Sequence, residues 1–241
     1  MNLRQLLFTK NDCYKAGRKI TPKGIMVHST GANNPTLRRY VGPDDGKLGA
    51  NSNNNHWNVG GLAVCVHAFI GKMADGSIAT YQVLPWNMRG WHCGGAGNNT
   101  HISFEICEDG LGDKSYFKAV YQEAVELCVM LCEQYGIKPE NVICHSEGAK
   151  RGIASNHADV MHWFPRHGKT MDDFRADVAR EMEEEDMGKI FNSLAEVPSY
   201  GKPTVEKLIK KGALKGDETG LNINDTMLRI LVINDRMGLY G

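Results

Sequence analysis

Short apolar segments alternate along this chain with helical ones, and this alternation limits the available folds more than any other feature. Residues 23–27, 62–70 and 77–83 are apolar runs of strand length, and the Asp-Gly turn at 74–76 predicts that the last two form a hairpin. Residues 101–107 alternate between apolar and other side chains, as in a strand with two different faces. The pattern predicts an α/β fold built on one central mixed β-sheet.

The clearest helix lies at residues 116–135, where apolar residues recur at helical spacing and the following glycine supplies a C-terminal stop. After it, residues 139–144 form a short predicted strand. Thr170 and Asp173 resemble a capping box at the start of an acidic helix. Strands and helices thus interleave, so we expect helices to flank the central sheet.

The chain divides into three predicted parts. We expect a main domain over residues 1–185, a linker over 186–203 that contains Gly, Ser and two Pro, and a small helical module over 204–241. At about 40 residues, the last part is marginal as an independent core. Its apolar side chains suit packing on the main domain, oligomer formation or the binding of a further ligand, and the sequence does not rank these roles.

Composition bears on partners and location. Lys and Arg number 28 against 28 Asp and Glu, which gives no reason to expect nucleic acid or an anionic membrane as the main partner. No run approaches the roughly 20 apolar residues that cross a bilayer, and residues 1–10 lack the pattern of a secretory signal. Seven Cys without a Cys-x-x-Cys pair favour buried thiols over a disulfide framework. We therefore expect a chain made in the cytoplasm and not inserted into a membrane.

Polar residues stand at ends or faces of separate predicted strands. They are His28, Glu105 and His145, with Asp159 in the loop that follows His145. A hydrolytic zinc site needs three protein ligands and an open position for water, commonly two imidazoles and a carboxylate or thiolate. His28, His145 and Asp159 satisfy that requirement, although each His alone is more often a hydrogen-bonding residue than a ligand.

The wider pattern resembles the type 2 N-acetylmuramoyl-L-alanine amidases, which are relatives of the peptidoglycan recognition proteins. The resemblance spans residues 23–178 in the family's order. It rests on residues 24–30 (GIMVHST), 66–70 (VHAFI), 75–76 (DG), 91–94 (WHCG), 99–106 (NTHISFEI), 145–147 (HSE) and 159–164 (DVMHWF).

The resemblance implies roles for the polar residues. His28 and His145 take the positions of zinc ligands, and Asp159 takes the third position, which other members fill with Asp or Cys. Glu105 takes the position of the catalytic carboxylate. His157 stands where many members have a Lys that stabilises the tetrahedral intermediate, and we assign it that catalytic role.

Some positions depart from the family pattern or have alternatives. His162, three residues after Asp159, is the main alternative third ligand, and His157 is another. Val66 stands where some phage members carry a Tyr, and the loop between His145 and Asp159 differs from the usual spacing.

Four side chains are candidates for substrate binding: Trp57, His67, Trp91 and His92. The Trp rings suit stacking on sugars, although Trp at such junctions more often covers the edge of a core. For the two His we favour the alternative, in which their ring nitrogens join loops or support the metal ligands.

The resemblance implies a zinc-dependent hydrolase, with Zn²⁺ as cofactor, that cleaves peptidoglycan between N-acetylmuramic acid and L-alanine. Zinc lowers the pKa of bound water to roughly 7, and Glu105 accepts the proton and returns it to the leaving nitrogen. With a C-terminal module that binds the wall or forms oligomers, this architecture predicts a phage or prophage endolysin released to the wall by a holin.

Two other functions remain open at this point. A recognition protein that binds peptidoglycan without cutting it is the first alternative, and a zinc hydrolase acting on another amide is the second. The apparently complete metal set and Glu105 favour the amidase, because a pure binding protein needs neither.

Overall fold

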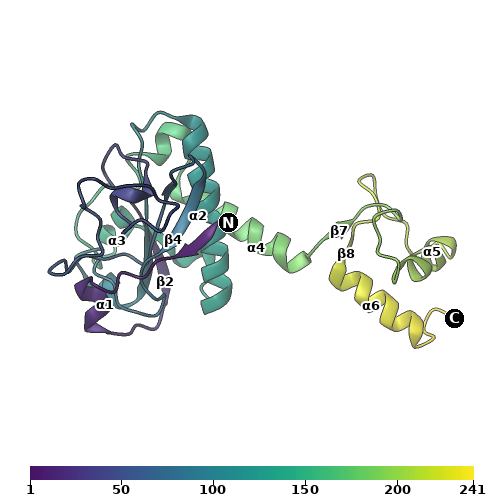
Figure 1. The fold of residues 1–241 in the computed structure, drawn as a ribbon. Helices are drawn as coiled ribbons and strands as arrows, with labels where there is room; N and C mark the ends of the chain where they lie inside the picture. The colour runs from purple at the N-terminus through teal and green to yellow at the C-terminus, as the bar shows by residue number, and fades with distance from the viewer. The chain divides into compact units, whose positions relative to one another are not determined.

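The computed structural model describes the backbone of residues 1–241 and the side chains of residues 1–184 and 188–241. The chain forms two compact units, residues 1–179 and residues 180–241. In the first unit, six strands form one sheet in the order β1-β4-β3-β5-β2-β6. Figure 1 shows β2 and β4 of this sheet. The strands are β1 (Leu3–Gln5), β2 (Gly24–Ser29), β3 (Ala68–Lys72), β4 (Ile78–Gln82), β5 (His101–Ile106) and β6 (Val142–Cys144).

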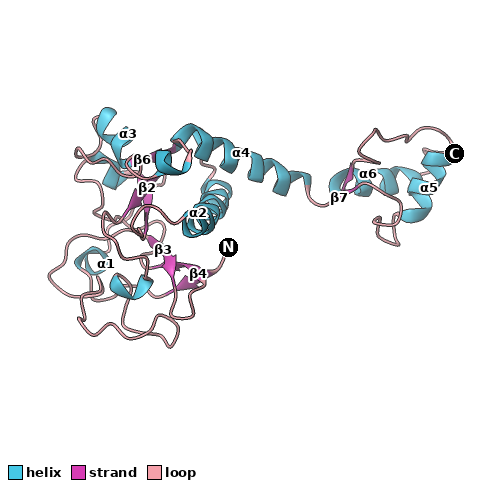
Figure 2. Cartoon of the chain, turned by 90° about the horizontal axis from the view of Figure 1, so that it is seen from above, coloured by secondary structure: helices cyan, strands magenta, loops and turns pink.

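Helices flank this sheet, and α2 packs against β3 and β4 (Figure 2). The α-helices that begin in this unit are α1 (Asp12–Ala16), α2 (Lys114–Tyr135), α3 (His145–Lys150) and α4 (Met171–Met187). The 3-10 helices are η1 (Leu37–Arg39), η2 (Ala96–Asn99), η3 (Pro139–Asn141) and η4 (Phe164–His167). Only the β3–β4 pair is antiparallel among the pairs of the six-stranded sheet. The predicted fold class, a central mixed sheet flanked by helices, is confirmed.

The ends of α2 and the start of α4 follow from local chemistry. Asp113 caps α2 by accepting a hydrogen bond from the amide of Tyr116, and Gly136 ends it with a left-handed φ of 62°. At α4, the amide of Asp173 donates to Thr170 Oγ1, and the amide of Thr170 donates to an Asp173 carboxylate oxygen. The predicted capping box is therefore present.

The first unit differs from the sequence prediction at several places. In the strand predicted over residues 139–144, Pro139–Asn141 form the 3-10 helix η3, and only Val142–Cys144 form β6. β3 begins at Ala68, so residues 62–67 of the predicted strand lie outside it, and Cys65 instead forms an isolated bridge with Trp91. β1 was not predicted; it pairs with β4 at the edge of the sheet. A three-residue strand is too short for periodicity to reveal it.

The second unit contains a two-stranded sheet and two helices: β7 (Ile190–Phe191), β8 (Ile223–Asn224), α5 (Lys202–Lys210) and α6 (Asp225–Arg236). Its core includes Val205, Ile223 and Leu228. Phe191 and Val197, from the segment predicted as a linker, are buried in the same core. Part of residues 186–203 thus belongs to the folded unit. Within the part of the chain that the structure describes, no helix is long and apolar enough to cross a membrane.

Phe104 tests the packing of the sheet, because it is fully buried in β5. Replacing it with Ala should lower the free energy of unfolding of the first unit by about 3–5 kcal/mol, since the deletion leaves a cavity. The exposed Val64→Ala control should change it by no more than about 0.5 kcal/mol. Urea unfolding followed by Trp fluorescence reports on this unit, because every Trp lies in it; equal losses for the two variants would contradict the prediction.

Candidate active site

The carboxyl ends of three neighbouring parallel strands bring predicted site residues together. β5, β2 and β6 are adjacent in that order. His28 is in register with Glu105, and Val27 with Cys144, the residue before His145. Residues at paired positions on neighbouring strands point to the same face of a sheet. The strand register therefore places His28, Glu105 and His145 at one end of the sheet.

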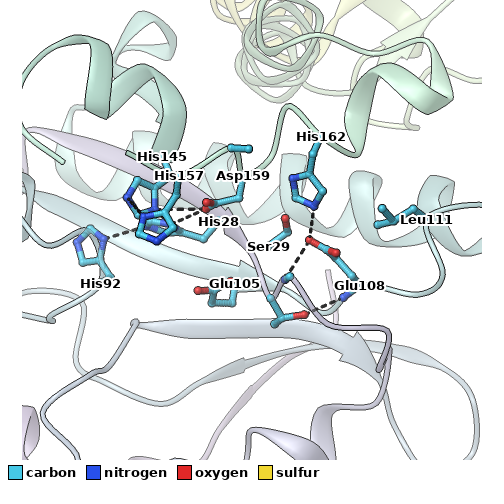
Figure 3. Close-up of a pocket in the computed structure, with 13 residues that line it drawn as sticks. His28, Ser29, His92, Glu105, Glu108, Leu111, His145, His157, Asp159 and His162 are labelled. Carbon is cyan, nitrogen blue, oxygen red and sulfur yellow. Dashed lines mark hydrogen bonds and ion pairs between the residues drawn. The ribbon is translucent and has the colours of Figure 1, made fainter. Parts of the chain in front are cut away.

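A pocket of about 550 Å³ lies over these strand ends (Figure 3). Asp159 enters it from the loop after α3, and its carbonyl accepts a hydrogen bond from the amide of Ser146 at 3.1 Å. The lining residues are His28, Ser29, Thr30, Gly31, His92, Glu105, Glu108, Leu111, His145, His157, Ala158, Asp159 and His162.

Three ligand atoms face one another in this pocket (Figure 3). His28 Nδ1 lies 2.9 Å from Asp159 Oδ2 and 3.1 Å from His145 Nδ1, and His145 Nδ1 lies 3.4 Å from the same Asp159 oxygen. Ligand atoms about 2.0–2.2 Å from a tetrahedral zinc are about 3.3–3.6 Å apart, close to this spacing. Two imidazole nitrogens and a carboxylate that converge in this way fit a small divalent cation.

The outer nitrogens of both His are held by neighbours. His28 Nε2 lies 2.9 Å from His92 Nδ1, and His145 Nε2 lies 3.2 Å from Ser155 Oγ. Because Ser155 Oγ donates to the carbonyl of Cys93, it accepts from the Nε2–H group of His145. With a metal ion bound, the Nε2–H tautomers would direct both Nδ1 lone pairs at the ion, whereas in the metal-free site a ring Nδ1–H group donates to Asp159. Sequence reasoning missed Ser155, whose position in an irregular loop gives no signal.

Burial and hydrogen bonding move the pKa of these groups in the direction that metal binding requires. Desolvation lowers the pKa of His28, against the effect of Asp159. Desolvation, with the neighbouring His28, lowers the pKa of His92 well below 6.5. Although desolvation alone raises the pKa of Asp159, hydrogen bonds with His145 and His28 hold it well below its usual range. Near neutral pH, His28 is therefore neutral and Asp159 is ionised.

Glu105 has the opposite shift. Desolvation raises its pKa well above 4.5, and the nearby carboxylates of Asp159 and Glu108 raise it further. Its Oε2 atom is buried and has no hydrogen-bond partner among the described residues. A carboxyl group with a raised pKa in a pocket is suited to accept and return a proton near neutral pH.

Glu108 is a buried pocket residue that sequence reasoning missed. Its Oε1 atom accepts hydrogen bonds from the amide of Gly31 at 3.1 Å and from His162 Nε2 at 2.9 Å. The structure therefore places His162, the alternative third ligand, on Glu108 and outside the three-residue group. The available signal was a carboxylate in the residue that directly follows the strand predicted over residues 101–107.

His157 lies in the pocket beside His145. Its Nδ1 atom is 3.0 Å from Ser155 Oγ and 3.3 Å from His145 Nε2, and the side chain is exposed. The structure thus brings His157 to the predicted place, and its catalytic role stays a prediction.

Of the four predicted substrate-binding residues, only His92 lines this pocket. Trp57 packs edge-on against the buried ring of Phe69. His67 is fully buried, its Nε2 atom donates to the carbonyl of Met88 at 2.7 Å, and desolvation lowers its pKa to about 4. Trp91 is exposed, but it does not line the pocket. The contacts of both His fit the favoured alternative, because His67 bonds to the carbonyl of Met88 and His92 contacts His28.

Comparisons with known proteins agree with this fold. Residues 17–164 match the family of N-acetylmuramoyl-L-alanine amidases, designated Amidase_2. This match covers more than half of the chain and includes all three residues of the convergent group. The chain belongs to this family.

A curated relative is the N-acetylmuramoyl-L-alanine amidase XlyA of Bacillus subtilis (strain 168), 40% identical over 68 residues. That match covers 27% of this chain and 22% of the length of XlyA. Among solved structures, PlyL has a TM-score of 0.52 and 23% identity, covering 74% of this chain and 96% of PlyL. A mutant endolysin from Bacillus subtilis has a TM-score of 0.51 and 24% identity, covering 74% and 99% of the two chains. These structures share the fold.

The raised pKa of Glu105 predicts a pH-dependent stability. A carboxyl group whose pKa rises on folding binds its proton more tightly in the folded state, so stability is lost as the pH rises from 4.5 through the folded pKa. In chelator-treated protein, Glu105→Gln should therefore increase the free energy of unfolding at about pH 7 and have little effect at about pH 4. Urea unfolding at the two pH values measures this, and a variant less stable than wild type at neutral pH would contradict it.

Proposed function

We propose that this chain is a zinc-dependent N-acetylmuramoyl-L-alanine amidase, which hydrolyses the amide bond between N-acetylmuramic acid and L-alanine in bacterial peptidoglycan. The observation that carries the proposal is the convergence of His28, His145 and Asp159 beside Glu105, whose pKa is raised, in one pocket. Family membership supports the substrate class. The opposite pKa shifts of Asp159 and Glu105 support separate roles for the two carboxylates.

In this proposal, His28 Nδ1, His145 Nδ1 and Asp159 Oδ2 hold Zn²⁺. This set of two imidazoles and one carboxylate is typical of hydrolytic zinc sites. When bound, the ion supplies Lewis acidity and brings the pKa of a water molecule to roughly 7. His92 and Ser155 keep the two ligand imidazoles in the required tautomer.

Glu105 moves the proton. Its Oε2 atom has no competing hydrogen-bond partner among the described residues, so the carboxylate accepts the proton of the attacking water. The same oxygen then gives the proton to the nitrogen of L-alanine as the amide bond breaks. Because Ser155 Oγ donates to the carbonyl of Cys93, His157 Nδ1–H donates to Ser155. The protonated ring of His157 also carries an Nε2–H group, which would donate to the carbonyl oxygen as negative charge develops there.

The biological setting that we propose is an endolysin that acts at the bacterial wall after release by a holin. A solved structure of the same fold is that of an endolysin, which supports this setting. We propose a catalytic domain over residues 1–185 and a small helical module over 204–241 that binds the wall or forms oligomers. Exposed Ile230 and Ile233 on α6 give that module apolar surface for either role.

Glu105→Gln tests the enzyme against a protein that only binds peptidoglycan. We expect it to lower the rate of wall lysis and the release of N-terminal alanine about 10²- to 10⁴-fold, because the general base is lost, while wall binding is retained. The exposed Glu140→Gln is the matched control and should act like wild type. If metal-loaded wild type binds walls and exposes no new alanine amino groups, the binding protein is the better description.

His92→Phe tests the support of the metal ligands. We expect it to weaken Zn²⁺ binding about 10- to 100-fold, because His28 loses the acceptor that fixes its tautomer. His162→Phe is the control in the same pocket and should leave the affinity nearly unchanged, since His162 contacts Glu108 instead. Competition with a chelator of known affinity measures both variants. Equal Zn²⁺ affinities for His92→Phe and wild type would refute the supporting role.

A further inference from the structure

A second pocket, of about 580 Å³, lies in the first unit between the N-terminal turns of α2 and the segment from η4 to α4. Among the described residues it shares no lining residue with the catalytic pocket. Its lining contains four Lys or Arg side chains and no acidic one. The lining residues are Lys114, Phe117, Lys118, Tyr121, Arg166, His167, Gly168 and Lys169.

One of these cations, Lys114, lies where it opposes the stability of its own helix. α2 begins at Lys114, and the partial positive charge at a helix N-terminus favours acidic residues there, yet the first turn of α2 has none. Lys114 and Lys118 are exposed, and neither forms an ion pair within the described part of the chain. A charge that destabilises its own helix marks a functional position, because another role of the residue outweighs the loss of stability.

Arg166 adds a third unpaired charge. Its Nε atom donates to the carbonyl of His162 at 3.1 Å, which anchors one edge of the guanidinium and leaves its terminal nitrogens for a ligand. Lys169 differs, because Asp177 neutralises it at 2.7 Å. The pocket therefore has an excess of positive charge from Lys114, Lys118 and Arg166.

His167 gives an independent sign of a ligand. Its ring stacks on Phe117, with 4.1 Å between the ring centres and 8° between the planes. Both ring nitrogens are buried, and neither has a hydrogen-bond partner among the described residues. Such orphaned polar atoms require an explanation, and a bound ligand or ion is one. Phe117 and His167 both line the pocket and contribute ring carbon atoms to it, which suits the carbon face of a sugar or polyol.

We propose that this pocket binds a phosphodiester group of an anionic wall polymer with sugar or polyol units. The guanidinium fork of Arg166 matches phosphate oxygens, and the two lysines supply further charge. Arg166 and Lys114 are close in sequence to His162 and Leu111, which line the catalytic pocket, so the polymer is held near the cleft. The choice of a wall polymer rests on the proposed function, whereas the phosphodiester chemistry rests on the pocket itself.

The test uses the full chain with a double charge reversal, Lys114→Glu and Lys118→Glu. Glutamate in the first turns of α2 favours the helix, so the variant is expected to fold. The matched control, Lys23→Glu with Lys138→Glu, makes the same charge change at exposed positions elsewhere in the first unit. The probes are soluble poly(glycerol phosphate) and bacterial walls before and after removal of phosphodiester polymers with hydrofluoric acid.

We expect wild type and control to bind poly(glycerol phosphate) equally, and the Lys114/Lys118 variant to bind about tenfold more weakly. Added salt should weaken wild-type binding, because the cations are exposed. Replacing both lysines with Arg should retain binding. Equal affinities of the charge-reversal variant and the control would overturn the proposal. So would a loss of wall binding in the variant that persists on stripped walls, because the ligand would then be a peptide carboxylate. The release of N-terminal alanine by wild type is measured separately. It tests the proposed amidase activity and not the binding of a ligand in this pocket.

Discussion

The parallel register of β5, β2 and β6 is the constraint on which the site depends. It sets His28 opposite Glu105 and places His145 directly after the end of the neighbouring strand β6. A shift of one residue would turn His28 to the other face of the sheet and separate it from both partners. Every residue of β2 is buried, so the packing on both faces of the sheet fixes this register. The core thereby determines the geometry of the polar site.

In the pocket over these strand ends, the surroundings of two carboxyl groups move their pKa values in opposite directions. Asp159 lies against two imidazoles, whose hydrogen bonds hold its pKa low and keep it ionised. Glu105 lies in the same pocket without such a partner, so burial and the neighbouring negative charges raise its pKa. When the pKa values of two neighbouring carboxyl groups differ in this way, the ionised group suits the role of a metal ligand. The group with the raised pKa suits proton transfer. The arrangement needs no charged residue beyond those that the sheet and one loop supply.

The sequence predicted those parts of the molecule that local patterns encode. The central sheet, α2 and the Thr170 capping box follow from periodicity and capping chemistry, and the grouping of His28, His145 and Asp159 follows from their motifs. Ser155 and Glu108 could not be predicted in their roles. Ser155 lies in an irregular loop, and the partners of Glu108, Gly31 and His162, lie 77 and 54 residues away along the chain. His67 and His92 occur in similar motif contexts, yet only the folded chain separates a core residue from a pocket residue. Phe191 and Val197 show the same limit, since a segment rich in Gly and Pro still contributes to a core.

Anomalous diffraction at the zinc edge from crystals of the metal-loaded full chain tests the central claim most directly. We expect one peak in the first unit within about 2.0–2.2 Å of His28 Nδ1, His145 Nδ1 and Asp159 Oδ2. A peak beside His162 and Glu108, or none at the three convergent residues in zinc-saturated protein, would contradict it.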